Sequence, residues 1–268
     1  MIPITVEQLA TLRSWFVPDR PGPLVGLHVI QTGNGTCLAD RWPDPRALLV
    51  ESAGNYTLTG DPRVLQPADL RGRVAGFLEA PARFLPLLQA AFPGLLVWDR
   101  VVLALEAPPR PPEGSGEPQG PEGSGEPQGG APVGRAPVRR LAAGDADQLG
   151  RLGEEAAWIG RTWGGPAGLA AGGTGWGAFA GGRLVSVACS FFVGERHEDV
   201  GVATEPGFRG QGLSTACAGA VCQDIFRRGR TPSWTTSPDN AASLRVAAKL
   251  GFALQRRDRL YVIEAPIP

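Results

Sequence analysis

The sequence predicts an α+β protein, with a mixed α/β fold divided between two domains. In the second part of the chain, segments of alternating apolar residues, typical of strands, are followed by segments with apolar residues at every fourth position, typical of helices. The segment PEGSGEPQG occurs twice in succession at residues 112–129, in a region poor in large apolar side chains. We therefore expect an N-terminal α+β domain at residues 1–106, a flexible Pro/Gly-rich linker at 107–136 and a C-terminal domain at 137–268.

The first domain has the weaker patterns. Apolar periodicity predicts two helices and three strands, at residues 6–16 and 68–92 and at residues 35–39, 47–58 and 95–105 respectively. We expect this domain to pack on the second one and to form a wall of its ligand pocket, as a decayed copy of the same fold. The alternative is a scaffold or an oligomerisation surface.

The second domain begins with two strand patterns. Residues 183–193, RLVSVACSFFV, are rich in apolar, β-branched and aromatic side chains, and residues 198–204 alternate. Polar residues separate the two segments, which predicts a hairpin. Apolar residues then recur at every fourth position from Leu213 to Ile225, which predicts a helix that ends before Gly229. The remaining elements are a short strand, a helix and an edge-type strand, at residues 231–236, 241–250 and 253–265 in that order.

Composition excludes several classes of partner. The chain has 26 basic and 26 acidic residues, so no overall field attracts it to nucleic acid or to an anionic membrane. No apolar segment is long enough to span a bilayer, and the start lacks a targeting pattern. The four cysteines lack metal-ligand spacing, so we interpret them as buried thiols and expect no metal. A cytoplasmic monomer or homodimer is expected.

One turn in the second domain has a composition that suits an anion. The segment TEPGFRGQGLS, at residues 204–214, joins a strand pattern to a helix pattern. The first N–H groups of a helix are unpaired and carry the positive end of its dipole, so they can bind phosphate. Gly210 and Gly212 allow close approach of the backbone, and Arg209 adds a cation. A plain strand-to-helix turn is the alternative. The turn lacks the G-K-[ST] of a nucleotide-hydrolysing loop and the acidic ribose ligand of a dinucleotide fold.

Two motifs of the second domain resemble the GNAT superfamily of acyl-CoA-dependent N-acetyltransferases. RGQGLS, at residues 209–214, resembles the R/Q-x-x-G-x-G/A loop, and DNAASLRVAAKLGF, at residues 239–252, is similar to the N-x-x-[AS]…KLGF segment. The resemblance covers residues 137–268, and residues 42–62 resemble the extra N-terminal half of a bacterial subgroup. It implies a twisted, mostly antiparallel mixed sheet flanked by helices, and transfer of an acetyl group from acetyl-CoA to a primary amine of a small molecule or peptide.

The same resemblance implies the cofactor-binding residues. The loop amides would bind the diphosphate of coenzyme A, the strand before the loop would hold the acetyl and pantetheine groups, and the later helix start would complete the site. These residues are Arg209, Gly210, Gln211, Gly212, Leu213 and Ser214 in the loop, Val202 and Thr204 in the strand, and Asn240 and Ser243 at the helix start. Asn240 is equally well explained as a helix N-cap, and Ser214 stands where Gly or Ala is usual.

The reaction needs a base, because an alkyl amine is protonated at neutral pH. Glu198 is our candidate, since it lies on the strand entering the loop, where many members of the family carry their base; the alternative is an ordinary solvated glutamate. His197 could replace it but would point to the other face of the strand. The usual tyrosine acid is absent, because Ala247 occupies the corresponding position. Ser243 or water could substitute.

The acceptor is not identified by any motif. Trp158, Trp163 and Trp176 lie in the segment where the family builds its acceptor-binding helices, so they either line an acceptor pocket or belong to the core. Loss of the tyrosine leaves a second hypothesis open, a catalytically silent acyl-CoA-binding module. A nucleic-acid-binding regulator is a third, which the neutral charge disfavours.

Overall fold

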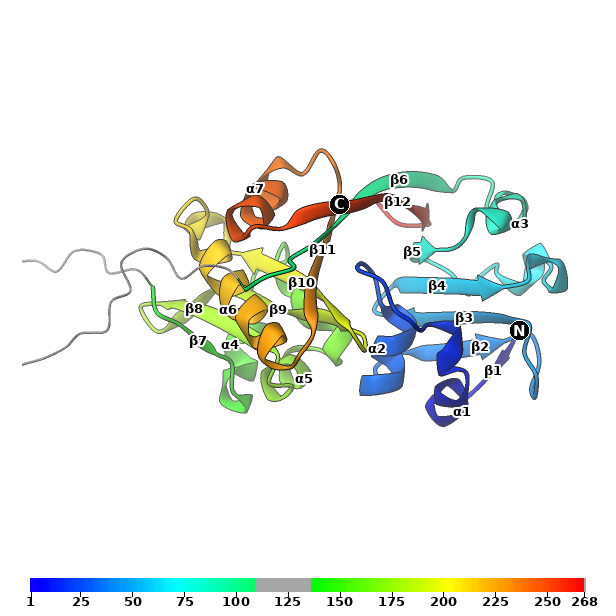
Figure 1. Ribbon diagram of the computed structural model, residues 1–268, viewed down its shortest axis with the longest axis horizontal. Helices are drawn as coiled ribbons and strands as arrows, with labels where there is room; N and C mark the ends of the chain where they lie inside the picture. The colour runs from blue at the N-terminus through cyan, green and yellow to red at the C-terminus, as the bar shows by residue number, and fades with distance from the viewer. Residues whose placement is uncertain (109–135, 268) are drawn as a thin grey trace, which may run out of the picture.

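The computed structural model describes residues 1–108 and 136–267, whose strands form one twelve-stranded sheet (Figure 1). The repeated PEGSGEPQG segment lies outside the described residues. From one edge to the other the strand order is β1-β2-β3-β4-β5-β12-β6-β11-β10-β9-β8-β7. We call residues 1–108 the N-terminal half and residues 136–267 the C-terminal half. Among the described helices, none is both long and apolar enough to cross a membrane.

The N-terminal half contributes six strands and three α-helices. Their bounds are β1 Ile2–Pro3, α1 Val6–Thr11, α2 Val25–Thr32, β2 Thr36–Ala39, β3 Ala47–Ser52, β4 Asn55–Gly60, β5 Gly76–Glu79, α3 Leu85–Ala91 and β6 Leu96–Ala104. The C-terminal half contributes β7 Val138–Arg140, α4 Ala146–Gly150, α5 Pro166–Ala171, β8 Gly175–Ala180, β9 Arg183–Val193, β10 His197–Thr204, α6 Leu213–Arg227, β11 Thr231–Thr236, α7 Ala241–Leu250 and β12 Ala253–Ile263.

The two halves repeat one strand topology. Strands β2, β3 and β4 are antiparallel neighbours, and β4 pairs parallel with β5. Strands β8, β9 and β10 are likewise antiparallel, and β10 pairs parallel with β11. The expected α+β class and mixed, mostly antiparallel sheet are confirmed, and the repeated topology is what a decayed copy would leave.

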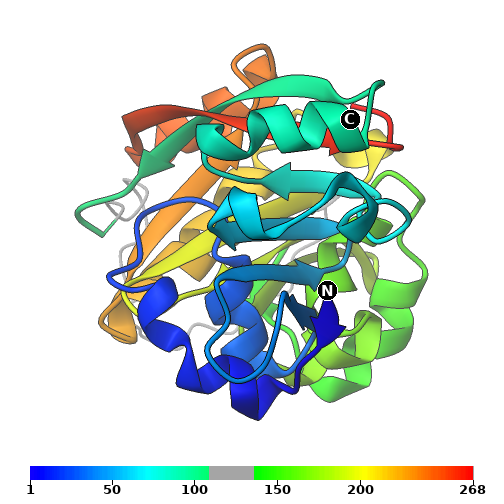
Figure 2. The ribbon, with the colours of Figure 1, turned by 90° about the vertical axis from the view of Figure 1, so that its right-hand side faces the viewer.

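The halves exchange strands at the centre of the sheet. Strand β6 of the N-terminal half pairs with β11, and β12 of the C-terminal half pairs with β5. The two exchanged strands also pair with each other along most of their length. Figures 1 and 2 show β6 and β12 crossing together from one half to the other. The expectation that β12 is an edge strand is therefore wrong for its end, because residues 261–263 pair with β5 and the strand lies inside the sheet; its charged residues 256–259 pair with β6 alone.

Two other expectations of the N-terminal half are corrected. The helix expected at residues 68–92 is interrupted by β5, which starts at Gly76 with φ +139°, a conformation that L side chains rarely adopt. Within it, α3 is the one α-helix, preceded by the short 3-10 helices Pro67–Asp69 and Ala82–Phe84. The single strand expected at residues 47–58 is a hairpin, because Ala53 and Gly54 take positive φ values of 52° and 76° and reverse the chain.

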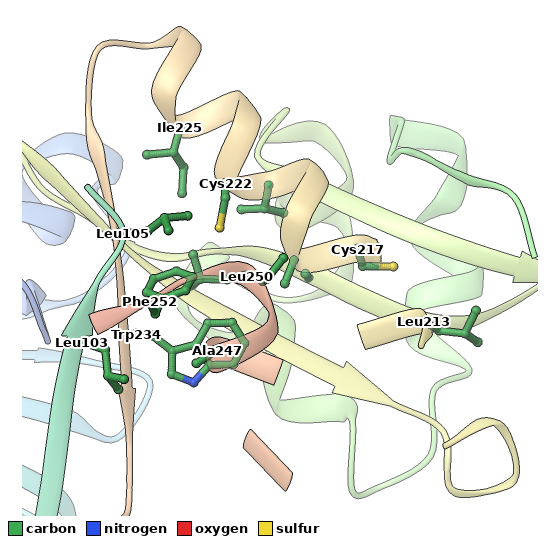
Figure 3. Packing of buried hydrophobic residues seen from close by; sticks show 14 of the residues in the cluster. Leu103, Leu105, Leu213, Cys217, Cys222, Ile225, Trp234, Ala247, Leu250 and Phe252 are labelled. Atoms are coloured by element: carbon green, nitrogen blue, oxygen red, sulfur yellow. The ribbon is translucent and has the colours of Figure 1, made fainter. Parts of the chain in front are cut away.

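Helices cover both faces of the C-terminal half. Helices α6 and α7 pack on one face, through Cys217, Val221, Ile225 and Leu250, against Trp234 of β11 (Figure 3). On the other face, α4, α5 and the 3-10 segment Ala157–Trp163 cover Leu184, Val187, Cys189 and Ala203. All four cysteines are buried and free, which confirms their interpretation as core thiols.

Candidate functional site

The site forms where two parallel strands separate. Pairing of β10 with β11 ends at Asp199 and Ser233, while β10 continues to Thr204. We call this unpaired gap between the strands the split. On its other side β10 remains paired with β9, where one extra residue, Phe191, is accommodated opposite Asp199 and Val200. Residues 200–204 therefore carry one backbone edge that no strand of the described residues pairs with.

Backbone alternation identifies the groups on that edge. The amide of Glu205 donates to the carbonyl of Val185 on β9. Because successive residues of a strand direct their N–H groups to opposite edges, Ala203 shares this direction. The amides of Val202 and Thr204 therefore point into the split, and Arg209 Nε bonds the carbonyl of Thr204 from that side at 3.3 Å. These two amides are therefore accessible as donors from the split.

The glycine-rich turn leads from the split to the start of α6. Gly210 and Gly212 have φ values of 78° and 79°, which require the left-handed region, and a Cβ at either position would meet open space. Helix α6 begins at Leu213 without a side-chain cap, so its first amides face outward. Gly210, Gln211 and Gly212 are exposed. An anion can thus approach these main-chain donors directly.

A chain of hydroxyl groups supports the turn. Ser214 Oγ lies 2.8 Å from Thr204 Oγ1, which lies 2.6 Å from Ser186 Oγ on β9. Leu213 is buried in the core beneath α6. Arg209, by contrast, is exposed and ion-paired with Glu155. The serine that departs from the family pattern therefore joins α6 to β10.

The second predicted segment lies at the start of α7. Asn240 Oδ1 accepts a hydrogen bond from the Ser243 amide at 3.0 Å, so the asparagine is the N-cap of α7. Ser243 Oγ accepts from Trp234 Nε1 at 2.9 Å. Ala247 is fully buried beside Trp234 in the α6–α7 core (Figure 3). The only hydroxyl among these side chains is that of Ser243.

Glu198 lies on β10 but is neither solvated nor free. It is 0% exposed, on the face covered by α6. Its Oε1 accepts from Arg228 Nε at 3.1 Å and from Arg230 Nη1 at 2.9 Å, and its Oε2 accepts from Arg228 Nη2 at 2.7 Å and from Ser190 Oγ. Both oxygens of the Glu198 carboxylate are therefore engaged by neighbouring donors. This contact set is that of a buried ion-pair network.

Asp199 is a residue that sequence reasoning overlooked. It is the last β10 residue paired with β11, on the face opposite Glu198, and is 6% exposed. Its Oδ1 accepts from Ser233 Oγ at 2.8 Å and from Thr235 Oγ1 at 3.1 Å. Burial raises the pKa of Asp199 to about 6 from its ordinary 3.8. It makes no salt bridge within the described residues, and its place beside Glu198 was the one signal available.

His197, the alternative base, takes part in the contact between the two halves. His197 Nδ1 lies 3.3 Å from Asp19 Oδ1, and Asp19 Oδ2 also accepts from the amides of Glu195 and Arg196 at 2.8 and 3.1 Å. These bonds join the β9–β10 hairpin to the N-terminal half.

The three tryptophans do not converge on one pocket. Trp158 packs edge-on against Phe191, and Trp163 Nε1 donates to the Ser190 carbonyl at 2.8 Å. Trp176 lies on the opposite face of the sheet, where it lines a groove of about 960 Å³ beside α6 and the ends of the described segments. Trp158 and Trp163 therefore belong to the core under β9, and Trp176 packs against the α6–α7 core at the edge of the groove.

Comparisons with known proteins point to one family. A family model described as GNAT acetyltransferase matches residues 149–261. An uncharacterized N-acetyltransferase of Streptomyces virginiae is 39% identical over 233 residues, which are 85% of this chain and 90% of that protein. The fold resembles that of a GCN5-related N-acetyltransferase-like protein from Streptococcus suis, with a TM-score of 0.68 at 17% identity over 97% of this chain and 99% of that one.

A solved structure also repeats the two-part architecture. A tandem GNAT protein from the clavulanic acid biosynthesis pathway superposes with a TM-score of 0.56 at 14% identity, over 100% of this chain and 99% of that one. The likeness to both structures concerns the fold, including its N-terminal half. Together with the identity to the Streptomyces virginiae protein, these matches show that the chain belongs to the GNAT acetyltransferase family.

Proposed function

We propose that the protein transfers the acetyl group of acetyl-CoA to a primary amine by direct attack of the amine on the thioester. The observation that carries the proposal is the continuity of two sets of free backbone donors: the β10 edge in the split and the uncapped start of α6. The open space at Gly210 and Gly212 suits a diphosphate, and the split suits the narrower pantetheine arm. Acetyl-CoA supplies the activated acyl group.

The donors of the split suit the charge that forms in the reaction. The amides of Val202 and Thr204 are held by a paired strand, so they need no reorganisation to stabilise negative charge on the acetyl oxygen. The loop from Arg209 to Ser214 would bind the diphosphate, and Asn240 would position the start of α7. The Arg209–Glu155 ion pair is exposed, so its exchange for a phosphate contact costs little.

Asp199 is the base that this geometry favours over Glu198. When the thioester lies in the split on the α6 side of the sheet, the amine attacks it from the opposite face. Alternation along β10 places Asp199 and Gly201 on that face. A Cβ added at Gly201 would lie 3.0 Å from Ile159 and 3.1 Å from Phe191. A carboxyl group with a pKa of about 6 can accept a proton near neutral pH.

The departing thiolate needs no dedicated acid. A thiol with an ordinary pKa near 8.5 is a tolerable leaving group. Ala247 offers no proton donor at the position of the usual tyrosine. The Ser243 hydroxyl group or a water molecule would therefore protonate the thiolate. The absence of the tyrosine is the observation that favours the second candidate, a module that binds acyl-CoA without transferring the acyl group.

Thiol release from acetyl-CoA across a panel of amines tests the proposal. We expect release with at least one amine, a loss of about 100-fold or more in kcat for Asp199→Asn, and retained turnover for folded Glu198→Gln. Binding of CoA by calorimetry should be unchanged in Asp199→Asn. Coenzyme A binding without release against any amine would favour the sensing module, and equal activity of Asp199→Asn and wild type would remove Asp199 as the base.

A further inference from the structure

The face of the sheet that carries Asp199 continues onto the strands where the two halves meet, a region of charged side chains that we call the junction. Residues of β5, β6, β11 and β12 share this face, because residues that lie opposite each other in paired strands point to the same side of a sheet. A small cavity of about 10 Å³ lies within the junction, room for about one water molecule. Its lining residues come from both halves: Pro23, Glu79, Arg100, Val102, Thr235, Asp258 and Leu260.

Most charged side chains of the junction form ion pairs with each other. Arg256 binds Asp258 through Nε and Nη2 at 2.9 and 2.8 Å. Arg20, an exposed side chain of the N-terminal half, lies 3.1 Å from Glu79 and 3.8 Å from Asp258. These pairs hold the cavity walls together. Because Arg20 is 64% exposed, its contacts are weak and can be displaced at the entrance.

Arg100 takes no part in these ion pairs. It makes no salt bridge within the described residues, and its buried Nε has no hydrogen-bond acceptor among them. Its Nη2 donates to the Thr235 carbonyl at 3.1 Å, and its guanidinium stacks 4.0 Å from the centre of the Trp98 ring. Burial lowers the pKa of Arg100 to about 10. The guanidinium is thus held in place by one hydrogen bond and one aromatic ring, and its buried Nε has no acceptor among the described residues.

Arg100 and Asp199 both form hydrogen bonds with Thr235. The Thr235 side chain donates to Asp199, and the Thr235 carbonyl accepts from Arg100. A cation and a carboxyl group that form no salt bridge among the described residues therefore flank Thr235, close enough to attract each other. A single small molecule carrying an amine and an acidic group can satisfy both.

We propose that the acceptor is an amino-acid-like molecule, whose carboxylate binds Arg100 while its amine faces Asp199. This inference rests on the proposed function, because it assigns the second substrate of that site. A carboxylate suits the guanidinium better than a phosphate does, since Glu79 and Asp258 line the same cavity and would repel a dianion. The site requires both halves, because Arg100 lies on the exchanged strand β6.

Matched acceptors test the assignment on the full-length protein. Thiol release is measured with the common L-amino acids, with their amides and with their decarboxylated amines. We expect the free acids to exceed the amides in kcat/KM by about 10-fold or more, the loss typical of removing a charged hydrogen bond. Arg100→Gln should lower kcat/KM for the acids about 10- to 100-fold and leave the amides unchanged, with partial recovery in Arg100→Lys.

A control variant and a binding measurement separate the outcomes. Arg257→Gln changes an exposed arginine of the neighbouring strand β12 and should alter neither substrate class. The assignment is overturned if Arg100→Gln lowers kcat/KM equally for acids and amides while its thermal unfolding is unchanged. It is also overturned if the wild type has the same kcat/KM for amides as for acids.

A wild-type protein that releases thiol with no acceptor would count against the proposed function instead. Calorimetry of L-amino acids with the CoA complex then decides the Arg100 site by itself. Binding that Arg100→Gln abolishes supports the carboxylate contact, and no binding to the wild type overturns it.

Discussion

At the scale of single residues, the two adjacent carboxylates of β10 have opposite environments. Asp199 is buried with two hydroxyl donors, and its folded-state pKa of about 6 lies above the ordinary 3.8. The folded protein therefore holds an extra proton between these pH values. The stability that this proton contributes is present below pH 3.8 and lost as pH rises through 6.

Replacement of Asp199 should therefore stabilise the protein where the carboxyl group is charged. Asn keeps an acceptor for Ser233 and Thr235 but cannot ionise. The shift from 3.8 to about 6 corresponds to about 3 kcal/mol. We expect Asp199→Asn to raise the free energy of unfolding by up to that amount at pH 8 and by little near pH 4, measured by urea denaturation. A uniform effect at both pH values would contradict the assignment of a buried, ionising Asp199.

Glu198 should show the reverse behaviour. Glu198→Gln removes the charge that faces Arg228 and Arg230, two guanidinium groups about 30% exposed at most. Breaking one side of a buried ion pair typically costs about 3–5 kcal/mol, and the partial exposure of the arginines places our expectation near the lower value. Urea denaturation at pH 7 measures it. A loss below about 1 kcal/mol would mean that the network is not structural.

At the scale of elements, the glycine turn makes a separate prediction. Gly212 has φ 79°, so Ala there costs about 1 kcal/mol of stability, yet its Cβ meets no protein atom. The Cβ would instead enter the open space beside the start of α6, where we propose that the diphosphate binds. We expect Gly212→Ala to fold and to weaken CoA binding at least about 10-fold by calorimetry. Gly207→Ala, also in open space but ahead of the turn, is the control and should bind normally.

The elements also show what the sequence could predict. The hairpin β9–β10, helices α6 and α7 and the turn between β10 and α6 were anticipated, because each has strong local periodicity and its own glycine or cap. The helix expected at residues 68–92 failed because its apolar residues also suit a strand once Gly76 turns the chain. The role of Asp199 depends on the residue at which β11 separates from β10, and the alternation of residues along β10 does not predict that residue.

At the scale of the whole molecule, the strand exchange could not be predicted from either half alone. The charged pattern of β12 suggests an edge strand, and only its pairing with β5 and β6 makes it central. A tandem GNAT protein shares the fold over the whole chain. The junction beside β6 and β12 exists because of the exchange, so the proposed acceptor site belongs to neither half by itself.

Contact between the halves also involves a buried histidine. His28 of α2 is 0% exposed; its Nε2 lies 2.8 Å from the Thr162 carbonyl, and its Nδ1 lies 3.3 Å from the Val193 amide. Since an amide can only donate, Nδ1 accepts and Nε2 carries the proton, so the ring is neutral. Burial lowers the pKa of His28 below its ordinary 6.5.

The contact should therefore weaken in mild acid. The unfolded chain binds a proton at His28 below pH 6.5, whereas the folded chain resists it, so stability falls as pH falls through this range. Asp199 has the opposite dependence and would mask the effect, so the test uses the Asp199→Asn background. There we expect the free energy of unfolding to decline from pH 7 to pH 5, and His28→Gln, which can still donate to Thr162, to reduce that decline. If the slope is the same with and without His28, the acid sensitivity of the two-half assembly has another source.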